Sequence, residues 1–313
     1  RDAQGRDVYF GSVAVGESSF HRRERLSLYR DGASDYRIYD HRARTTTSFR
    51  PLVASGVSSP IETVDAWGNT IRYEHVDGRL ESITDTAGRV VSLRWQRGRI
   101  TRIEVGGGGG LEAWVDYEYD DAGQLVAVID ALGCTDEFEY DGYGRMVATT
   151  TRLGVRFQYE YDKDSGRCRK TWGPNGRYAI ELEYDDAKRT THVYGEESRL
   201  IEWDDLPGFA RRESTLDGNV LEERAYDSDG YLIATANGAG EGSKSWFDAR
   251  GNEVRRVDAT GLTTTWEYDD RDCLRRRKDP DGTHVEYSVD DRGSVLSVRE
   301  RSGRLVQLSH DSF

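Results

Sequence analysis

Three short stretches of the sequence carry closely spaced carboxylates of the kind that can bind calcium. They are Asp162-Lys163-Asp164-Ser165-Gly166, Asp227-Ser228-Asp229-Gly230 and Asp279-Pro280-Asp281-Gly282. A calcium loop of the EF-hand type needs further oxygen ligands and a Glu at its end. None of the three stretches continues in that way, so we interpret them as turns and expect no metal and no cofactor.

The other residues that could do chemistry are scattered along the chain. The six histidines form no i, i+4 pair and no cluster with cysteine, which disfavours a zinc site. Gly238 to Gly242 lacks the lysine of a phosphate-binding loop, and no Gly-x-Ser-x-Gly elbow occurs. Cys134, Cys168 and Cys273 lie far apart and are predicted to be free thiols. A glycosidase-type carboxylate pair stays an alternative, although nothing marks one pair as special.

Composition narrows the class of protein. The net charge is 44 − 57 = −13, which argues against nucleic acid as a partner because phosphate binding needs clustered Lys and Arg. The charged share of 32% is high, so a sheet that is wet on at least one face fits better than a conventional sandwich. No stretch is long and apolar enough for a membrane span. The opening Arg1-Asp2-Ala3-Gln4-Gly5 is typical of a turn, so we expect a piece of a longer protein.

A repeat of about 21 residues organises the chain from about residue 61 onward. Residues 117–123 read YEYDDAG and residues 138–144 read FEYDGYG, each followed two places later by Leu or Met. The aromatic-Asp pair recurs through Tyr268-Asp269, and degenerate copies occur at Val289-Asp290 and His310-Asp311. Earlier copies centred on Tyr73 and Trp95 lack the Asp. A spacing of about 21 residues that is kept over so many units predicts a repeat architecture. The predicted structural anchors are Tyr119, Asp120, Gly123, Tyr140, Asp141, Gly144, Tyr161, Asp162, Tyr184, Asp185, Tyr226, Asp227, Gly230, Tyr268 and Asp269.

The residue types of the repeat predict a β-hairpin. An Asp side chain can accept from backbone N–H groups two residues on, and the Gly supplies the positive φ of a type I turn plus bulge. Alternation puts the aromatic pairs on one strand face and Glu118, Glu139 and Glu160 on the other. We expect the aromatics to stack as a ladder and arginines to separate the Glu column. The arginines predicted for this role are Arg145, Arg167 and Arg189.

Residues 1–60 are predicted to be a β-rich lead-in, followed by repeats over 61–313. The Arg22–Arg25 and Arg42–Arg44 patches of the lead-in are interpreted as solvated strand ends. Pro51 to Pro60 is the candidate boundary, and Gly106 to Gly110 is predicted to be a mobile loop. About eleven units would give roughly twenty strands, and so wide a single sheet must curl. The predicted fold class is therefore all-β, a meander of hairpins coiled into a hollow shell.

Tyr-Asp-x-x-Gly-x-Leu followed by Asp-x-x-Gly resembles the YD-repeat, or Rhs, family, over about residues 61–313. The resemblance implies a bacterial β-cocoon shell that encloses a C-terminal toxin, with the toxin and the self-cleaving element outside these residues. It implies no enzyme activity for this chain and, as partners, the enclosed toxin domain, secretion-spike or delivery proteins and an immunity protein. It also implies a secreted or delivered effector, made in the cytoplasm before export, as in type VI secretion and interbacterial competition.

Two other functions stay open on the sequence. One is a surface adhesion or carbohydrate-binding module, because rows of exposed aromatic rings can bind sugars. Its candidate residues are Trp95, Trp114, Trp172, Trp203, Trp246 and Trp266. The other is an enzyme within these residues, for which no catalytic residue is assigned.

Overall fold

The protein is one continuous antiparallel meander of β-strands. The computed structural model describes residues 7–52, 57–107, 110–204 and 210–310. These residues form 28 strands and a single 3-10 turn, η1 (Pro174–Gly176). Each strand pairs with the next one along the chain, from β1 with β2 to β27 with β28. The predicted all-β meander of hairpins is confirmed.

The predicted lead-in, residues 1–60, contains the first four strands and the start of β5, and the predicted repeat region contains the rest. The lead-in strands are β1 (Ser18–His21), β2 (Leu26–Arg30), β3 (Tyr36–Asp40) and β4 (Thr45–Pro51). The first repeats contain β5 (Ser58–Asp65), β6 (Thr70–Val76), β7 (Arg79–Asp85), β8 (Val90–Gln96), β9 (Arg99–Gly107), β10 (Gly110–Tyr119), β11 (Leu125–Asp130), β12 (Thr135–Tyr140), β13 (Met146–Thr150), β14 (Arg156–Tyr161), β15 (Cys168–Trp172) and β16 (Ile180–Asp185). The later repeats contain β17 (Thr190–Tyr194), β18 (Arg199–Asp204), β19 (Ala210–Thr215), β20 (Val220–Tyr226), β21 (Leu232–Asn237), β22 (Gly242–Phe247), β23 (Glu253–Val257), β24 (Thr263–Tyr268), β25 (Leu274–Lys278), β26 (His284–Val289), β27 (Val295–Arg299) and β28 (Leu305–Gln307).

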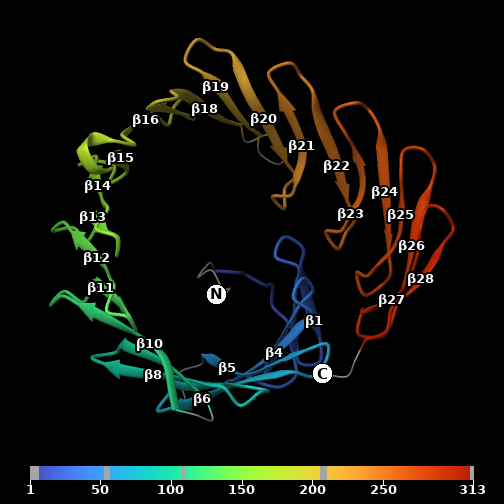
Figure 1. Cartoon of the computed structure of the whole chain (residues 1–313), viewed down its shortest axis with the longest axis horizontal. Coiled ribbons are helices and arrows are strands. Elements are labelled where there is room, and N and C mark those ends of the chain that lie inside the picture. Colours follow the sequence, from blue (N-terminus) through green and yellow to red (C-terminus); the bar gives the residue numbers. More distant parts are fainter. Residues whose placement is uncertain (1–6, 53–56, 108–109, 205–209, 311–313) are drawn as a thin grey trace.

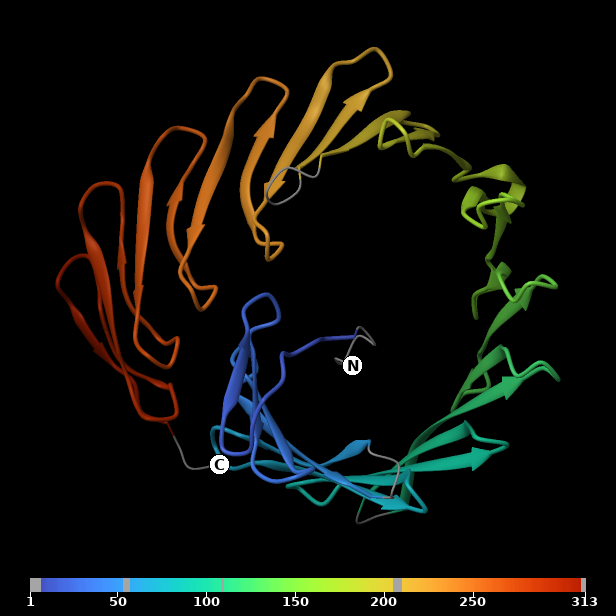
Figure 2. The same ribbon diagram turned by 180° about the vertical axis from the view of Figure 1, so that it is seen from behind.

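The ribbon bends through a full turn into a ring. Figure 1 shows the hairpins following one another around an open centre, and Figure 2 shows the same ring from behind. In both views the lead-in hairpins lie next to the turns of the late repeats, and the N-terminal segment runs toward the centre. A wide twisted sheet cannot stay flat, which is the physical reason for the predicted curl.

The sheet has almost no conventional core. Among the described residues, the buried hydrophobic side chains are Val13, Leu93, Ala127, Ala148 and Cys273. No second layer covers the described part of the sheet, so most strand residues are half-buried against their cross-strand neighbours. Stability must therefore come mainly from backbone ladders, turns and side-chain pairs along the ribbon.

Two turns alternate along the repeat, as predicted. At one edge of the ribbon lies the turn after the Tyr-Asp pair, called here the YD turn, in which the Gly123 N–H donates to Asp120 O at 2.9 Å. At the other edge lies the second turn, in which the Gly133 N–H donates to Asp130 O at 2.9 Å. The register shifts between Glu139 and Tyr140, so the predicted bulge lies beside the YD turn.

Two other sequence features fall at particular places in the sheet. β4 pairs with β5 across the candidate boundary at Pro51 to Pro60, so the sheet runs on without a break. Of the glycine insertion, Gly108 and Gly109 lie outside the described residues. The flanking β9 and β10 pair up to Gly107 and Gly110.

The turn glycines give a direct test of the turn geometry. Gly133 has φ +79°, and a Cβ there would meet nothing within 4 Å, so Gly133→Ala isolates the backbone strain. We expect a loss of about 1 kcal/mol in the free energy of unfolding, measured by urea denaturation. Gly142→Ala is the matched control, because Gly142 also has open space but no positive φ. An equal loss in both variants would contradict the predicted turn strain.

Candidate functional site

The predicted Asp anchors nucleate the YD turns. Asp141 Oδ1 accepts from the backbone N–H groups of Tyr143 at 2.9 Å and Arg145 at 3.0 Å. Asp227 and Asp269 accept in the same i+2 and i+4 pattern. Asp120, Asp162 and Asp185 also accept from backbone N–H groups of their own turns. These donors lower the pKa of the Asp120 carboxyl, and the backbone N–H of Gln124 has the largest effect.

The predicted Tyr anchors tie each repeat to the one before it. The Tyr140 hydroxyl donates to Leu125 O at 2.8 Å, and the Tyr161 hydroxyl donates to Met146 O at 2.6 Å. In each case the acceptor is the residue two places after the turn Gly of the preceding unit. Tyr119, Tyr184 and Trp95 donate to the corresponding carbonyls of Ile100, Cys168 and Leu80, and His310 Nε2 lies 2.7 Å from Val295 O. Tyr226 and Tyr268 end β20 and β24 in the same phase.

The predicted aromatic ladder and its arginines need correction. Within the described residues, Tyr119, Tyr161 and Tyr184 do not stack on one another; an arginine guanidinium lies over each of these three rings instead. Arg145 lies 4.9 Å from the centre of the Tyr161 ring, and Arg167 lies 5.0 Å from that of Tyr184. Arg145 also pairs with Asp141, and Arg167 with Asp186, so neither separates the Glu column.

Two members of the Glu column, Glu139 on β12 and Glu160 on β14, pair with other arginines, on β14 and β15. Arg156 pairs with Glu139 at 2.5 Å, and Arg169 pairs with Glu160. Arg145 and Arg167 lie directly after a turn Gly, and at that place a turn Asp is nearer to the guanidinium than any Glu of the column is.

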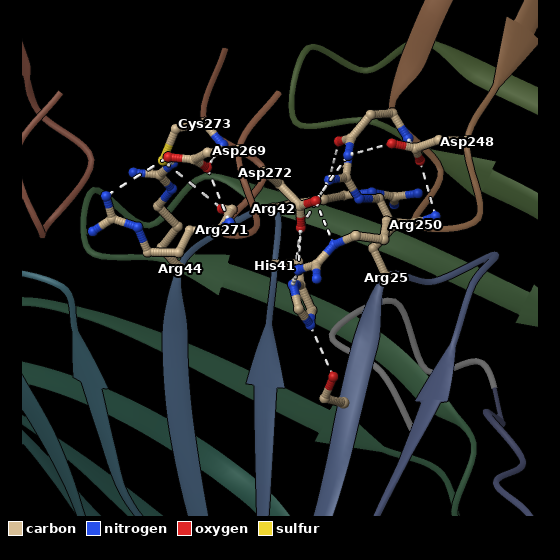
Figure 3. Close-up of polar contacts among 12 residues, drawn as sticks. Arg25, His41, Arg42, Arg44, Asp248, Arg250, Asp269, Arg271, Asp272 and Cys273 are labelled. Atoms are coloured by element: carbon tan, nitrogen blue, oxygen red, sulfur yellow. Dashed lines mark hydrogen bonds and ion pairs between the residues drawn. The ribbon is translucent and has the colours of Figure 1, made fainter. Parts of the chain in front are cut away.

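The structure brings together a second set of residues that the repeat did not predict. We call it the closure seam: Arg22, Arg25, His41 and Arg44 of the lead-in, with Asp227, Asp229, Tyr231, Asp248, Arg250, Asn252, Asp272, Cys273 and Arg292 of the late repeats. The two groups lie 205 to 248 positions apart in sequence. Figure 3 shows the central part of the seam, with the lead-in residues reaching up to the turns of the late repeats.

Arg22 holds one end of the closure seam. Its guanidinium donates to Asp248 O at 3.0 and 3.1 Å and pairs with Asp227 at 3.1 Å and with Asp229. Tyr231 donates its hydroxyl to Arg22 O at 2.7 Å, and its ring lies 4.8 Å below the guanidinium. The YD turn that starts at Asp227 is therefore both a repeat anchor and a docking point for the lead-in.

Asp272 is the centre of the closure seam, and its side chain is only 4% exposed. Arg250 donates to both of its oxygens at 2.6 and 3.0 Å, and Asn252 donates to Oδ1 at 2.8 Å. From the lead-in, Arg25 lies 3.4 Å and His41 Nδ1 lies 3.1 Å from Oδ2. Figure 3 shows Arg25, His41 and Arg250 around Asp272, with their contacts drawn as dashed lines.

Electrostatics in the seam follow from this crowding. Burial raises the pKa of the Asp272 carboxyl, but hydrogen bonds from Arg250 and Asn252 and the charges of Arg250 and Arg25 outweigh it. The resulting pKa is about 2. Burial lowers the pKa of the His41 imidazole; Asp272 opposes this, and Arg250 and Arg25 add to it, so the net pKa lies below its usual value.

At the far end of the seam Arg44 contacts a buried thiol. Its guanidinium lies 2.8 Å from Cys273 Sγ and donates to Arg292 O at 3.0 Å. The predicted free thiols are consistent with this arrangement, since Cys134, Cys168 and Cys273 are all unpaired with one another. The prediction that the arginine patches of the lead-in are solvated strand ends is therefore wrong for Arg22, Arg25 and Arg44. These three side chains contact the late repeats.

One sequence signal does mark the seam. In the unit Tyr268-Asp269-Asp270-Arg271-Asp272, an Asp occupies the position of the turn Gly, and it has φ +63°. Arg25 and Arg44 also lie in the left-handed region, with φ +54° and +55°. Non-glycine residues in that region carry strain that the surroundings must offset, and such positions cluster at functional sites.

The tryptophans considered for sugar binding take part in contacts within the sheet. Trp95 Nε1 donates to Leu80 O, and Trp172 Nε1 donates to Gln158 at 3.0 Å. Arginines lie over the rings of Trp114, Trp203 and Trp246. Among the described residues no cluster of three or more His, Cys, Asp or Glu has the arrangement of a metal site.

The fold and the seam define a class of protein: a single-layer ribbon of β-hairpin repeats that bends into a ring and closes on itself. The family model described as RHS Repeat matches residues 119–156 and 247–284. Both stretches contain predicted Tyr and Asp anchors, such as Tyr140 and Asp141 in the first and Tyr268 and Asp269 in the second. The units between them keep the spacing of about 21 residues. Over these two stretches the chain carries repeats that match the Rhs-repeat family model.

Solved structures with a similar chain trace include a mutant TccC3 form of the Photorhabdus luminescens Tc holotoxin pore. It has 13% sequence identity and a TM-score of 0.37, and the match covers 88% of this chain and 21% of that one. TcdB2-TccC3 without its hypervariable C-terminal region has 14% identity and a TM-score of 0.31, with 88% and 22% covered. The chain thus spans about a fifth of the length of these proteins. No curated protein matches the sequence. Within the described residues, no helix has the length and apolar character needed to cross a membrane.

The tyrosine hydroxyls can be tested one at a time. Tyr140→Phe removes the bond to Leu125 O and leaves that half-buried carbonyl without its side-chain donor, so we expect a loss of about 1 kcal/mol in the free energy of unfolding. Tyr143→Phe in the same unit is the control, because Tyr143 is 87% exposed. Urea denaturation measures both, and no difference between them would refute the proposed tie between repeats.

The charge on Asp272 predicts a pH dependence. Its pKa in the folded protein, about 2, lies below the ordinary 3.8, so its contribution is fully present above pH 3.8 and is lost as pH falls through 2. Asp272→Asn should therefore lower the free energy of unfolding by at most about 2 kcal/mol at pH 7, less after solvent screening.

The deficit of Asp272→Asn relative to the wild type should shrink as pH falls from 4 to 2, which urea denaturation at several pH values measures. Asp291→Asn, at a fully exposed position, serves as the control and should show no deficit. A deficit in Asp272→Asn that does not change with pH would contradict the account.

Proposed function

We propose that this chain is a segment of the hollow shell of an Rhs-type toxin, which encloses a C-terminal toxin domain outside these residues until delivery. The observation that carries the proposal is the closure of a single-layer ribbon on itself at the seam. A ring closed by specific contacts between segments more than 200 residues apart separates an inside from an outside. An open curved sheet would not.

The thin core supports the same proposal. A solid β-protein of this size buries large apolar side chains between two layers, whereas a shell wall needs only one layer. Here no side chain among the described residues is both large and fully buried. The surface of the ring carries paired charges such as Arg156 with Glu139, which suits a wall with solvent on both sides.

The proposal gives these residues a mechanical role and no catalytic one. Within it, the longer protein is a secreted or delivered bacterial effector, with the enclosed toxin, delivery or secretion-spike proteins and an immunity protein as partners. Type VI secretion and competition between bacteria are one setting for such an effector. The Rhs repeats support this branch of the proposal.

A protease-protection experiment tests the proposal in the longer protein that contains this segment. The shell predicts that the C-terminal domain resists added protease while the ring is closed. Arg22→Ala combined with Arg25→Ala removes lead-in contacts to Asp227, Asp248, Asn252 and Asp272, so the domain should then be digested at least several-fold faster.

Arg152→Ala is the matched control, because Arg152 pairs with Asp130 and Asp136 within the ribbon and away from the seam. It should leave the protection unchanged. A C-terminal domain that is digested equally fast in all three proteins would show that the segment does not enclose it.

A further inference from the structure

The closure seam contains a histidine, His41, whose side chain is only 10% exposed. The His41 ring packs edge-on against Phe20 and Tyr39, with centroid separations of 5.2 and 4.7 Å. Ser27 Oγ lies 2.8 Å from Nε2, and Asp272 Oδ2 lies 3.1 Å from Nδ1. A carboxylate only accepts, so Nδ1 carries the proton and Nε2 accepts from Ser27. Both ring nitrogens are satisfied in the neutral form.

Two arginines of the seam lie close to this ring. Arg250 Nη2 lies 3.5 Å from Nδ1, and Arg25 reaches the same Asp272 oxygen as the histidine. A cavity of about 180 Å³ beside the ring is lined by further charged and titratable groups. These are Arg44, Arg271, Arg292, Asp270, Asp291, Tyr29, Tyr39 and Cys273. Around His41 and this cavity, five arginines face three carboxylates: Arg25, Arg44, Arg250, Arg271 and Arg292 against Asp270, Asp272 and Asp291.

Asp272 has no capacity left for another cation. Its Oδ1 accepts from Arg250 and Asn252, and its Oδ2 faces Arg250, Arg25 and His41. Arg25 and Arg250 against the single carboxylate of Asp272 leave a net positive charge beside the ring, where the side chains of Arg25 and Asp272 are only 17% and 4% exposed. A protonated His41 would add to it, and buried like charges repel strongly because water does not screen them.

We propose that the closure seam is an acid-sensitive latch, in which protonation of His41 releases the lead-in turns from the late repeats. At neutral pH the uncharged histidine links Ser27 of the lead-in to Asp272 of the late repeats and so holds these two parts of the ring together. In acid the imidazolium prefers water, and it reaches water only when the lead-in separates from the turns that carry Arg250 and Asp272. The latch is a property of the ring and does not depend on what the ring encloses.

The direction of the effect follows from the lowered pKa of His41 in the closed state. A group whose pKa is lower in the closed state favours closure at high pH. That preference is fully present above the ordinary value of 6.5 and is lost as pH falls through the lower value of the closed state. One proton taken up on opening changes the ratio of open to closed seam about tenfold per pH unit.

Ser27, His41 and Asp272 are connected in the order of a hydrolase triad, but the surroundings disfavour catalysis. Ser27 is only 8% exposed and lies inside β2, paired with Phe20 on one side and Tyr39 on the other. A nucleophile needs an open face and free N–H donors for an oxyanion, and a residue within a ladder of three strands offers neither. The three residues form a structural link.

Energy transfer between two fluorophores tests the latch. We would attach them to Ala43→Cys, at the exposed tip of the lead-in, and Asp291→Cys, on the facing turn, after Cys134→Ser and Cys168→Ser. We expect high transfer at pH 7.5 and a reversible fall between pH 6.5 and 5, with far-ultraviolet circular dichroism unchanged. His41→Gln should move the midpoint down by a pH unit or more, whereas His192→Gln, on β17, should leave it in place.

Three results would overturn the latch: no fall in transfer down to pH 5, the same midpoint in His41→Gln as in the parent, or a fall that accompanies loss of β-structure. If His41→Gln fails to close, ¹⁵N-histidine spectra of the parent protein decide instead. His41 should then protonate over the pH range in which transfer falls, and protonation without a change in transfer would refute the proposal. Hydrolysis of p-nitrophenyl esters that is lost in Ser27→Ala would also overturn the structural reading of the triad.

Discussion

The structure depends on one constraint: a single-layer sheet has no second layer on which to bury an apolar face. In the part of the chain that the structure describes, the 28 strands pair with their sequence neighbours, and very few side chains are buried. Each repeat must therefore be held by bonds to the next repeat. The Asp of the YD turn fixes the hairpin end, and the Tyr hydroxyl ties the strand to a carbonyl of the preceding unit. With every unit built alike, a small bend per hairpin adds up to a ring.

A ring built this way needs a closure that the repeat itself does not supply. The closure seam closes the ring through arginines of the lead-in and carboxylates of the late YD turns. Closure is therefore mainly electrostatic, whereas the wall is held mainly by hydrogen bonds. A contact made of charges responds to pH and salt far more than an apolar contact of the same size would. The wall and the closure can thus differ in stability within one sheet, and the seam can open while the repeats stay folded.

The sequence was sufficient for the repeat because its signals are local. Turn residues such as Asp141 and Gly144 act within four positions, so their roles follow from their types and spacing. The arginines of the Glu column were misassigned because Arg145 has a nearer partner in Asp141, and only coordinates show which carboxylate is closer. The seam was not predictable from spacing, since Arg25 and Asp272 meet only after the whole ribbon has curved. The Asp at position 272, where other units have the turn Gly, indicates in the sequence that this turn differs from the rest. It does not indicate that Arg25 and His41 of the lead-in contact it.

The central claim is that the ribbon closes into a ring through the seam. Small-angle X-ray scattering of this chain in solution tests it most directly, on the wild type and on Arg22→Ala/Arg25→Ala. We expect the distance distribution of a closed ring for the wild type, and a larger radius of gyration for the variant at unchanged circular dichroism. A wild-type profile that fits an open arc or a rod, or identical profiles for the two proteins, would contradict it.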